Sequence, residues 1–178
     1  MFSTGKRVLI IARSGRVLSE AAASGGWSPW VVDQFADLDT KLAAETVVRL
    51  NTVGDGGFNE SELLATLSEF VVRGGAMPLV LGSGLESAPE LVLAIERHHS
   101  LYGCNSSVLQ SLVDRPAVFE QLRNFSEFQF PVTQHSRPEH APGWLCKRIG
   151  GAGGEHVRVV SSSMDIRRDE YFQRHIPG

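Results

Sequence analysis

The sequence predicts an α/β fold that begins with a Rossmann-like parallel sheet. Three observations favour this class: β-rich runs alternate with helical patterns, the first run (7–12, RVLIIA) is continuously apolar, and glycine turns follow the runs. A continuous apolar run is typical of a strand that is buried on both faces, as strands of parallel sheets are. We therefore expect parallel strands joined by crossover helices in the first hundred residues.

The later elements of this first part follow from hydrophobic spacing, from proline and from glycine. Apolar side chains at helical spacing, ending on paired glycines, indicate one long helix, and a proline marks the start of another. In chain order we expect a turn at 13–16, helix at 17–26, strand at 29–35, helix passing into strand at 40–50, loop at 51–59 and helix at 60–75. A strand with a glycine turn at its carboxyl end follows at 78–86, and then a helix at 89–99.

The second part of the chain has a different pattern. Residues 106–125 predict two helices that meet at Asp114-Arg115-Pro116, with Asp114 as an N-cap and Pro116 in the first turn. A short strand is expected at 130–134. A strand at 144–149, a glycine-rich stretch and a β-branched run at 155–160 predict a hairpin, and the chain then reaches YFQRHIPG.

Strand-turn-helix units with glycine turns raise the possibility of a dinucleotide site. Its fingerprint, G-x-G-x-x-G, would have to follow the first strand and open a helix. The residues there are Arg13-Ser14-Gly15-Arg16, and Gly82-Ser83-Gly84 lacks the third glycine. The sequence therefore disfavours NAD binding.

Composition excludes several classes of protein. The 178 residues carry a net charge of −3, and their basic residues are scattered, so we expect no nucleic-acid partner. No apolar run approaches the roughly 18 residues of a membrane span, and the start of the chain lacks a cleavage signal. Cys104 and Cys146 are too few for a disulfide framework or a zinc site, which favours a cytoplasmic location. The histidines show no metal-ligand spacing, so we expect them, including His156, at the surface.

The hairpin places a lysine just before a run of glycines. Backbone amides of glycines can close on a phosphate chain, and a lysine on the neighbouring strand can supply the compensating charge. The alternative is a flexible hairpin tip with no ligand. A Walker A loop is excluded because Lys147 precedes the glycines and no Gly-Lys-Ser/Thr follows.

This order of parts resembles the ATP-grasp superfamily. The stretches KRIGGAGGEHVR and YFQRHIPG look most like the carboligase-like proteins related to biotin carboxylase. The resemblance implies an α/β substrate-side (pre-ATP-grasp) domain at 1–100, followed at 101–178 by the first, incomplete lobe of an ATP-grasp domain. It also implies binding of ATP and an unidentified carboxylate substrate.

The resemblance further implies which residues contact the nucleotide. Lys147 matches the lysine on the phosphates, and Arg115 stands where many members have a lysine. The backbone of the last strand would pair with the adenine edge. The full set is Arg115, Lys147, Gly150, Gly151, Gly153, Gly154, Gln173, Arg174 and Ile176.

The function implied is that of the amino-terminal portion of an ATP-dependent carboxylate-amine ligase or carboligase that works through an acyl phosphate. In the family, the ribose carboxylate, the magnesium ligands and the catalytic arginine lie beyond the position that matches Gly178. We therefore expect magnesium only in a complete protein, no catalytic residue here, and a chain that is inactive alone. The alternative is a non-catalytic nucleotide or small-ligand binding module, possibly a homodimer paired through 171–178.

Overall fold

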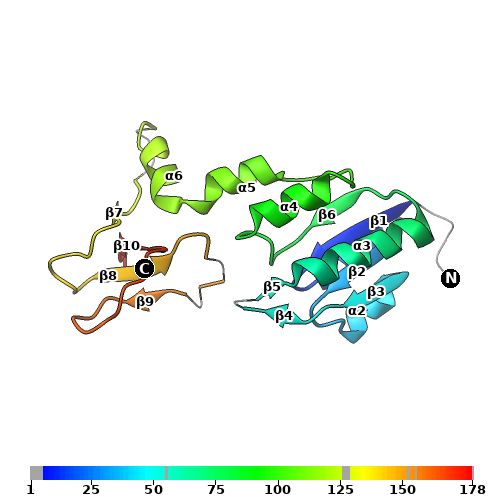
Figure 1. Ribbon diagram of the computed structural model, residues 1–178, viewed down its shortest axis with the longest axis horizontal. Helices are drawn as coiled ribbons and strands as arrows, with labels where there is room; N and C mark the ends of the chain where they lie inside the picture. Colours follow the sequence, from blue (N-terminus) through cyan, green and yellow to red (C-terminus); the bar gives the residue numbers. More distant parts are fainter. Residues whose placement is uncertain (1–5, 55, 126–128, 152, 155, 178) are drawn as a thin grey trace. The chain divides into compact units, whose positions relative to one another are not determined.

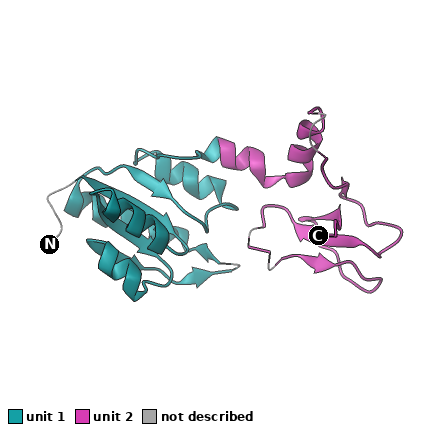
Figure 2. Ribbon diagram, turned by 180° about the vertical axis from the view of Figure 1, so that it is seen from behind, with its two compact units in different colours: residues 1–107 teal, residues 108–178 magenta. Residues whose placement is uncertain are grey.

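The computed structural model describes residues 6–54, 56–125, 129–151, 153–154 and 156–177. It divides into two compact units, Met1–Ser107 and Val108–Gly178 (Figure 2). No helix among the described residues has the length and apolarity needed to cross a membrane.

The first unit is built on a four-stranded parallel sheet, as predicted. Its strand order is β3-β2-β1-β6, and every pairing in it is parallel. The chain thus adds strands on one side of β1 and later on the other, with helices between them (Figure 1). The elements are β1 (Arg7–Ala12), α1 (Arg16–Ser24), β2 (Ser28–Asp33), α2 (Leu38–Ala43), β3 (Thr46–Arg49), α3 (Glu60–Gly74), β6 (Leu79–Leu81) and α4 (Pro89–Glu96).

Both faces of this sheet are covered, which explains the continuous apolar sequence of β1. Val8, Ile10 and Val31 form one buried cluster, against which Leu18 of α1 packs. Trp30 meets Phe70 of α3 edge to face, with ring centroids 5.1 Å apart. Alternate residues of a strand point to opposite faces, so a strand between two helical layers needs apolar side chains throughout.

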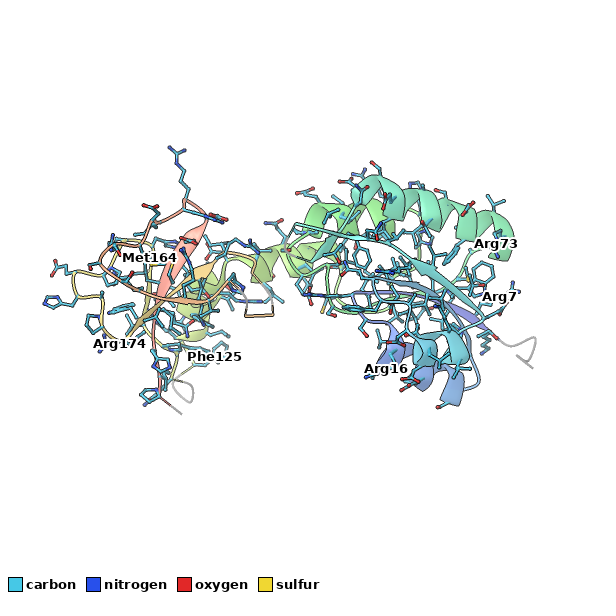
Figure 3. All side chains as sticks on the ribbon, turned by 90° about the horizontal axis from the view of Figure 1, so that it is seen from below. Arg7, Arg16, Arg73, Phe125, Met164 and Arg174 are labelled. Carbon is cyan, nitrogen blue, oxygen red and sulfur yellow. The ribbon has the colours of Figure 1, made fainter. Side chains whose placement is uncertain are left out.

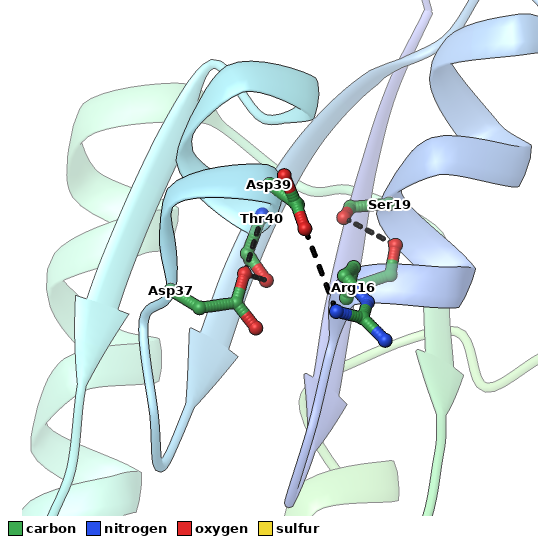
Figure 4. A network of polar contacts seen from close by, with 5 residues as sticks. All are labelled: Arg16, Ser19, Asp37, Asp39 and Thr40. Carbon is green, nitrogen blue, oxygen red and sulfur yellow. Dashed lines mark hydrogen bonds and ion pairs between the residues drawn. The ribbon is translucent and has the colours of Figure 1, made fainter.

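Local capping fixes where α2 begins and how it meets α1. The Asp37 carboxylate accepts hydrogen bonds from the amide of Thr40 at 2.8 Å and from its hydroxyl at 2.9 Å. Such a cap satisfies amides that have no partner within the helix. Arg16 at the start of α1 reaches Asp39 at 3.4 Å, and Ser19 donates to the carbonyl of Arg16 (Figure 4).

The prediction of a loop at 51–59 is wrong in part. Two short strands, β4 (Thr52–Val53) and β5 (Gly57–Phe58), form an antiparallel hairpin there. The Gln34 side chain donates to the carbonyls of Gly56 at 3.0 Å and Gly57 at 2.9 Å, and Phe58 is buried. The hairpin therefore depends on a side chain distant in sequence, and a local glycine pattern does not show this.

Trp30 is a packing residue of the first unit. The guanidinium carbons of Arg7 and Arg73 lie 5.2 and 5.3 Å from its ring centroid, and both arginines are at the same end of the unit (Figure 3). Cations near an aromatic ring are attracted by its quadrupole. The two arginines thus help to bury the indole of Trp30.

The second unit contains an antiparallel sheet of order β7-β10-β8-β9 preceded by two helices. The predicted hairpin is confirmed, because β8 pairs with β9 antiparallel, although β9 is shorter than the predicted run at 155–160. Asp114 caps α6 through the amide of Ala117, also as predicted. The elements are α5 (Ser106–Val113), α6 (Arg115–Leu122), β7 (Thr133–Gln134), β8 (Trp144–Arg148), β9 (Arg158–Val159) and β10 (Glu170–Arg174).

Candidate functional site

Lys147 and Gln173 lie on one face of the antiparallel sheet. Lys147 is directly opposite Tyr171 in the register of β8 and β10, and Gln173 is opposite Leu145. Directly opposed residues share a face, and diagonal neighbours on it are within reach of long side chains. The Lys147 Nζ accordingly donates to the Gln173 Oε1 at 3.0 Å. The structure therefore brings together two residues that sequence analysis assigned to one site.

The Lys147 side chain is partly withdrawn from water. Burial lowers the pKa of its ammonium group below the usual lysine value, because the charged form loses hydration. Its carbonyl partner, Gln173, carries no charge. A negatively charged ligand would offset that lost hydration, so the site is suited to an anion.

The glycine segment, residues 150–154, follows directly from β8. Gly150, Gly153 and Gly154 have positive φ angles of 72°, 73° and 82°, a backbone conformation that favours glycine. Ala152 lies outside the described residues. The amide of Gly150 donates to the carbonyl of Val113 at 3.0 Å, which holds the start of the segment against the end of α5. The segment is thus anchored at its first residue.

Gly151 is glycine for a different reason. A Cβ built on it would lie 2.5 Å from Cδ2 of His156, so the imidazole packs directly over its Cα. The expectation of a surface His156 is wrong: the residue is half-buried, and its Nδ1 is buried without a hydrogen-bond partner among the described residues. The ring folds back over the hairpin because Gly151 leaves space for it.

Arg115 begins α6 and is linked electrostatically to the sheet. Its Nη1 donates to the carbonyl of Leu112 at 2.9 Å. Tyr171 is 3% exposed; burial raises the pKa of its hydroxyl, while the charge of Arg115 lowers it and that of Asp114 raises it. Since Tyr171 is the cross-strand partner of Lys147, the charge of Arg115 acts on the face that carries the lysine.

The two residues whose backbone was predicted to contact adenine, Arg174 and Ile176, have different surroundings. Arg174 is still in β10, where its amide donates to the carbonyl of Val132 at 2.8 Å and its guanidinium lies 5.7 Å from the Trp144 ring centroid. Ile176 lies beyond the strand and is 62% exposed. The groups assigned to adenine are the carbonyl of Arg174 and the amide of Ile176. The hydrogen bond that the amide of Arg174 donates to Val132 uses neither group, so it does not compete with that role.

The opposite face of β8 holds an ion pair that sequence reasoning missed. Arg158 of β9 donates to Oε1 of Glu170 at 2.5 Å, and the amide of Arg167 donates to Oε2 at 2.9 Å. Burial opposes ionisation of Glu170, but the amide of Arg167, the Cys146 thiol and Arg158 together hold its pKa below the usual value. Glu170 is 7% exposed, but neither its burial nor its partner can be predicted from the sequence, because both depend on how β9 and β10 are brought to β8.

No group of three His, Cys, Asp or Glu residues that could hold a metal ion occurs among the described residues.

Comparison with known proteins identifies the fold. No family model matches the chain, and no curated protein matches it by sequence. Solved structures do match: pyruvate carboxylase of Rhizobium etli (TM-score 0.67, 15% identity, 98% of this chain and 18% of that one) and L-amino acid ligase of Bacillus licheniformis (0.64, 15%, 98% and 45%). An ADP complex of N5-carboxyaminoimidazole synthetase from Staphylococcus aureus also matches (0.64, 13%, 97% and 48%). The chain spans less than half the length of each, and the likeness shows a shared fold.

Proposed function

We propose, from the fold that this chain shares with the amino-terminal part of ATP-grasp enzymes, that it is the ATP-binding portion of a carboxylate-amine ligase or carboligase. Residues 1–100 would form the substrate-side domain and 101–178 the first nucleotide lobe. The observation that carries the proposal is the partly buried Lys147, held by Gln173 on the sheet face next to the glycine segment.

Binding would use groups that the structure already orients. The Lys147 ammonium has three donors, so it can keep its bond to Gln173 and still donate to a phosphate oxygen. Amides of the glycine segment would donate to the β- and γ-phosphates, as consecutive main-chain amides do in other anion sites. Arg115, near Tyr171, would add a second positive charge. Together these groups would bind and orient the phosphate chain.

The reaction proposed for the complete enzyme has two steps. A substrate carboxylate oxygen attacks the γ-phosphorus, and the bond to the β-phosphate oxygen breaks, giving an acyl phosphate and ADP. An amine then attacks the acyl carbon, loses a proton and displaces phosphate. Magnesium would supply charge neutralisation in such a transfer. This chain's own residues would hold the nucleotide, and we expect the chain alone to bind ATP without turning it over.

The carboxylate would approach the carboxyl ends of the parallel strands, because ligands of open α/β sheets bind there, where the strand order reverses. The turns after β1 and β6 meet at this point: the amide of Arg13 donates to the carbonyl of Ser83 at 2.6 Å. The Arg13 guanidinium passes close to Gly56, where an added Cβ would lie 2.9 Å from its Nη1. We assign Arg13 as the cation that would meet the carboxylate.

Isothermal titration of the 178-residue chain with ATP tests the nucleotide site. Lys147→Ala should weaken ATP binding by about tenfold or more, because one charge-assisted contact contributes ~1.5–3 kcal/mol. The matched control is Lys41→Ala, which removes an exposed lysine of α2. Equal affinities of the Lys147 and Lys41 variants would contradict the assignment, as would a wild-type chain without ATP binding.

The pH dependence of binding gives a second test of Lys147. Its charged form binds phosphate, so ATP affinity should be full below its lowered pKa and should decline as the pH rises through that value. Lys147→Arg keeps the charge throughout and should remove the decline. Titrations from pH 7 upward measure this, and a decline that persists in the arginine variant would assign it to another group.

A further inference from the structure

The carboxyl-terminal side of the glycine hairpin is weakly attached to the sheet. β9 contains two residues, and its ladder with β8 consists of the pairs Leu145 with Val159 and Cys146 with Arg158. The amino-terminal side, in contrast, is part of the five-residue strand β8. Just after this strand, the amide of Gly150 donates a hydrogen bond to the carbonyl of Val113. The carboxyl-terminal side has fewer main-chain bonds: the two-residue ladder and the hydrogen bond from the amide of Val160 to the carbonyl of Trp144 at 3.0 Å, so side-chain contacts contribute more to its attachment.

Those contacts come from Glu170 at the start of β10. One carboxylate oxygen accepts from Arg158 at 2.5 Å and the other from the amide of Arg167 at 2.9 Å. The thiol of Cys146 lies beneath, 3.8 Å from Arg158 Nη2. The ion pair thus spans β8 and joins β9 to β10, two strands that do not pair with each other.

The two partners of this ion pair differ in burial, so they differ in what happens when the other partner is lost. The Glu170 side chain is 5% exposed and that of Arg158 43%. A carboxylate buried to this extent cannot recover its hydration if the arginine is removed, whereas the arginine can turn to water. The geometry of β9 is consequently set by the fixed carboxylate of β10.

We propose that the Arg158–Glu170 ion pair positions the glycine segment for nucleotide binding by fixing β9 to β10. This inference deepens the proposed function and rests on it. Lys147 and Gln173 lie on the opposite face of the same strands, so the ion pair does not contact the nucleotide. Arg158 and Glu170 are therefore positioning residues: they fix the end of the segment, at β9, whereas the hydrogen bond from Gly150 to Val113 fixes its start.

Two readouts test the proposal in the 178-residue chain. The first is hydrogen exchange of peptides covering 150–160, which needs no nucleotide. The second is ATP affinity by titration. Glu170→Gln should speed exchange in 150–160 and weaken ATP binding by about tenfold, within the range of coupling in contacting charge networks. Glu120→Gln is the matched control, because Glu120 pairs with Arg123 on the exposed side of α6 in the same unit.

A double-mutant cycle separates positioning from general loss of stability. The double variant, Arg158→Gln with Glu170→Gln, should lose no more ATP affinity than the more damaging of the two single variants. Arg158→Lys, which keeps the positive charge, should lose less ATP affinity than Arg158→Gln. Additive losses, unchanged exchange in 150–160, or a loss of affinity equal to the unfolded fraction measured by circular dichroism would each overturn the proposal. If the wild-type chain does not bind ATP, the proposed function fails, while the exchange result still decides whether the ion pair fixes the hairpin.

Discussion

Replacing Asp33 should strongly destabilise the first unit. It ends β2 and is fully buried. Its Oδ1 accepts from the amides of Phe35 and Ala36, each at 2.5 Å, and its Oδ2 accepts from the amide of Gly15 at 2.6 Å. In a dinucleotide fold an acidic residue near this point binds a ribose; here both carboxylate oxygens are used by the protein itself, consistent with the missing glycine fingerprint.

The size of the effect follows from these three donors. Leaving a buried amide without a partner costs about 1–3 kcal/mol, and removing a buried charge gives some of that back. Asp33→Ala should therefore lower the free energy of unfolding of the first unit by about 4 kcal/mol, a large part of the ~5–15 kcal/mol of a typical domain. Asp33→Asn should cost about 2 kcal/mol, because one amide oxygen can still serve Phe35 and Ala36 while the NH2 group faces the amide of Gly15.

Urea unfolding followed by tryptophan fluorescence measures this change. A Trp144→Phe background leaves Trp27 and Trp30 as reporters, and both belong to the first unit. Asp39→Ala in the same background is the control, since Asp39 is exposed and pairs only loosely with Arg16. A difference between the Asp33→Ala and Asp39→Ala variants of less than about 1 kcal/mol would refute the reasoning from unsatisfied amides.

Three further outcomes can be measured. Gly151→Ala should displace the His156 ring, because its Cβ would lie 2.5 Å from that ring, and should change the His156 NMR shifts; unchanged shifts would contradict this packing. Since the folded-state pKa of Glu170 is depressed, its stabilisation is present above the ordinary value near 4.5 and is lost as the pH falls through the lowered pKa, so Glu170→Gln should flatten the acid limb of a stability–pH curve. Burial, with help from Glu170, raises the pKa of the Cys146 thiol, so a thiol reagent should label exposed Cys104 in the native chain and both cysteines only in denaturant.

Much of the fold could be predicted because its signals are local. The helix expected at 60–75 is α3 (Glu60–Gly74), and Asp114 caps α6 as its position before Arg-Pro suggested. The hairpin at 51–59 could not be predicted, since it depends on Gln34, which is about twenty residues away in sequence. The strand expected at 78–86, with a glycine turn at its carboxyl end, is the three-residue strand β6 (Leu79–Leu81), and the predicted turn follows it from Gly82.

The candidate site also has features that could be predicted from the sequence and features that could not. A lysine before a glycine run is visible in the sequence, and cross-strand register with β10 then brings Lys147 to Gln173. The partner of Glu170 was not visible, because twelve residues and a turn separate it from Arg158. For His156, the absence of metal-ligand spacing said nothing about burial, which depends on the space above Gly151.

The alternation along β8 has a practical consequence for engineering. Neighbouring side chains of this strand serve separate tasks: Lys147 faces the proposed ligand side, and Cys146 faces the buried ion pair and the Phe172 cluster. A mutagenesis library that varies positions 145 and 147 would therefore explore ligand preference, whereas one that varies 144 and 146 would explore folding yield. Selecting from the two libraries separately would keep specificity and expression as independent traits.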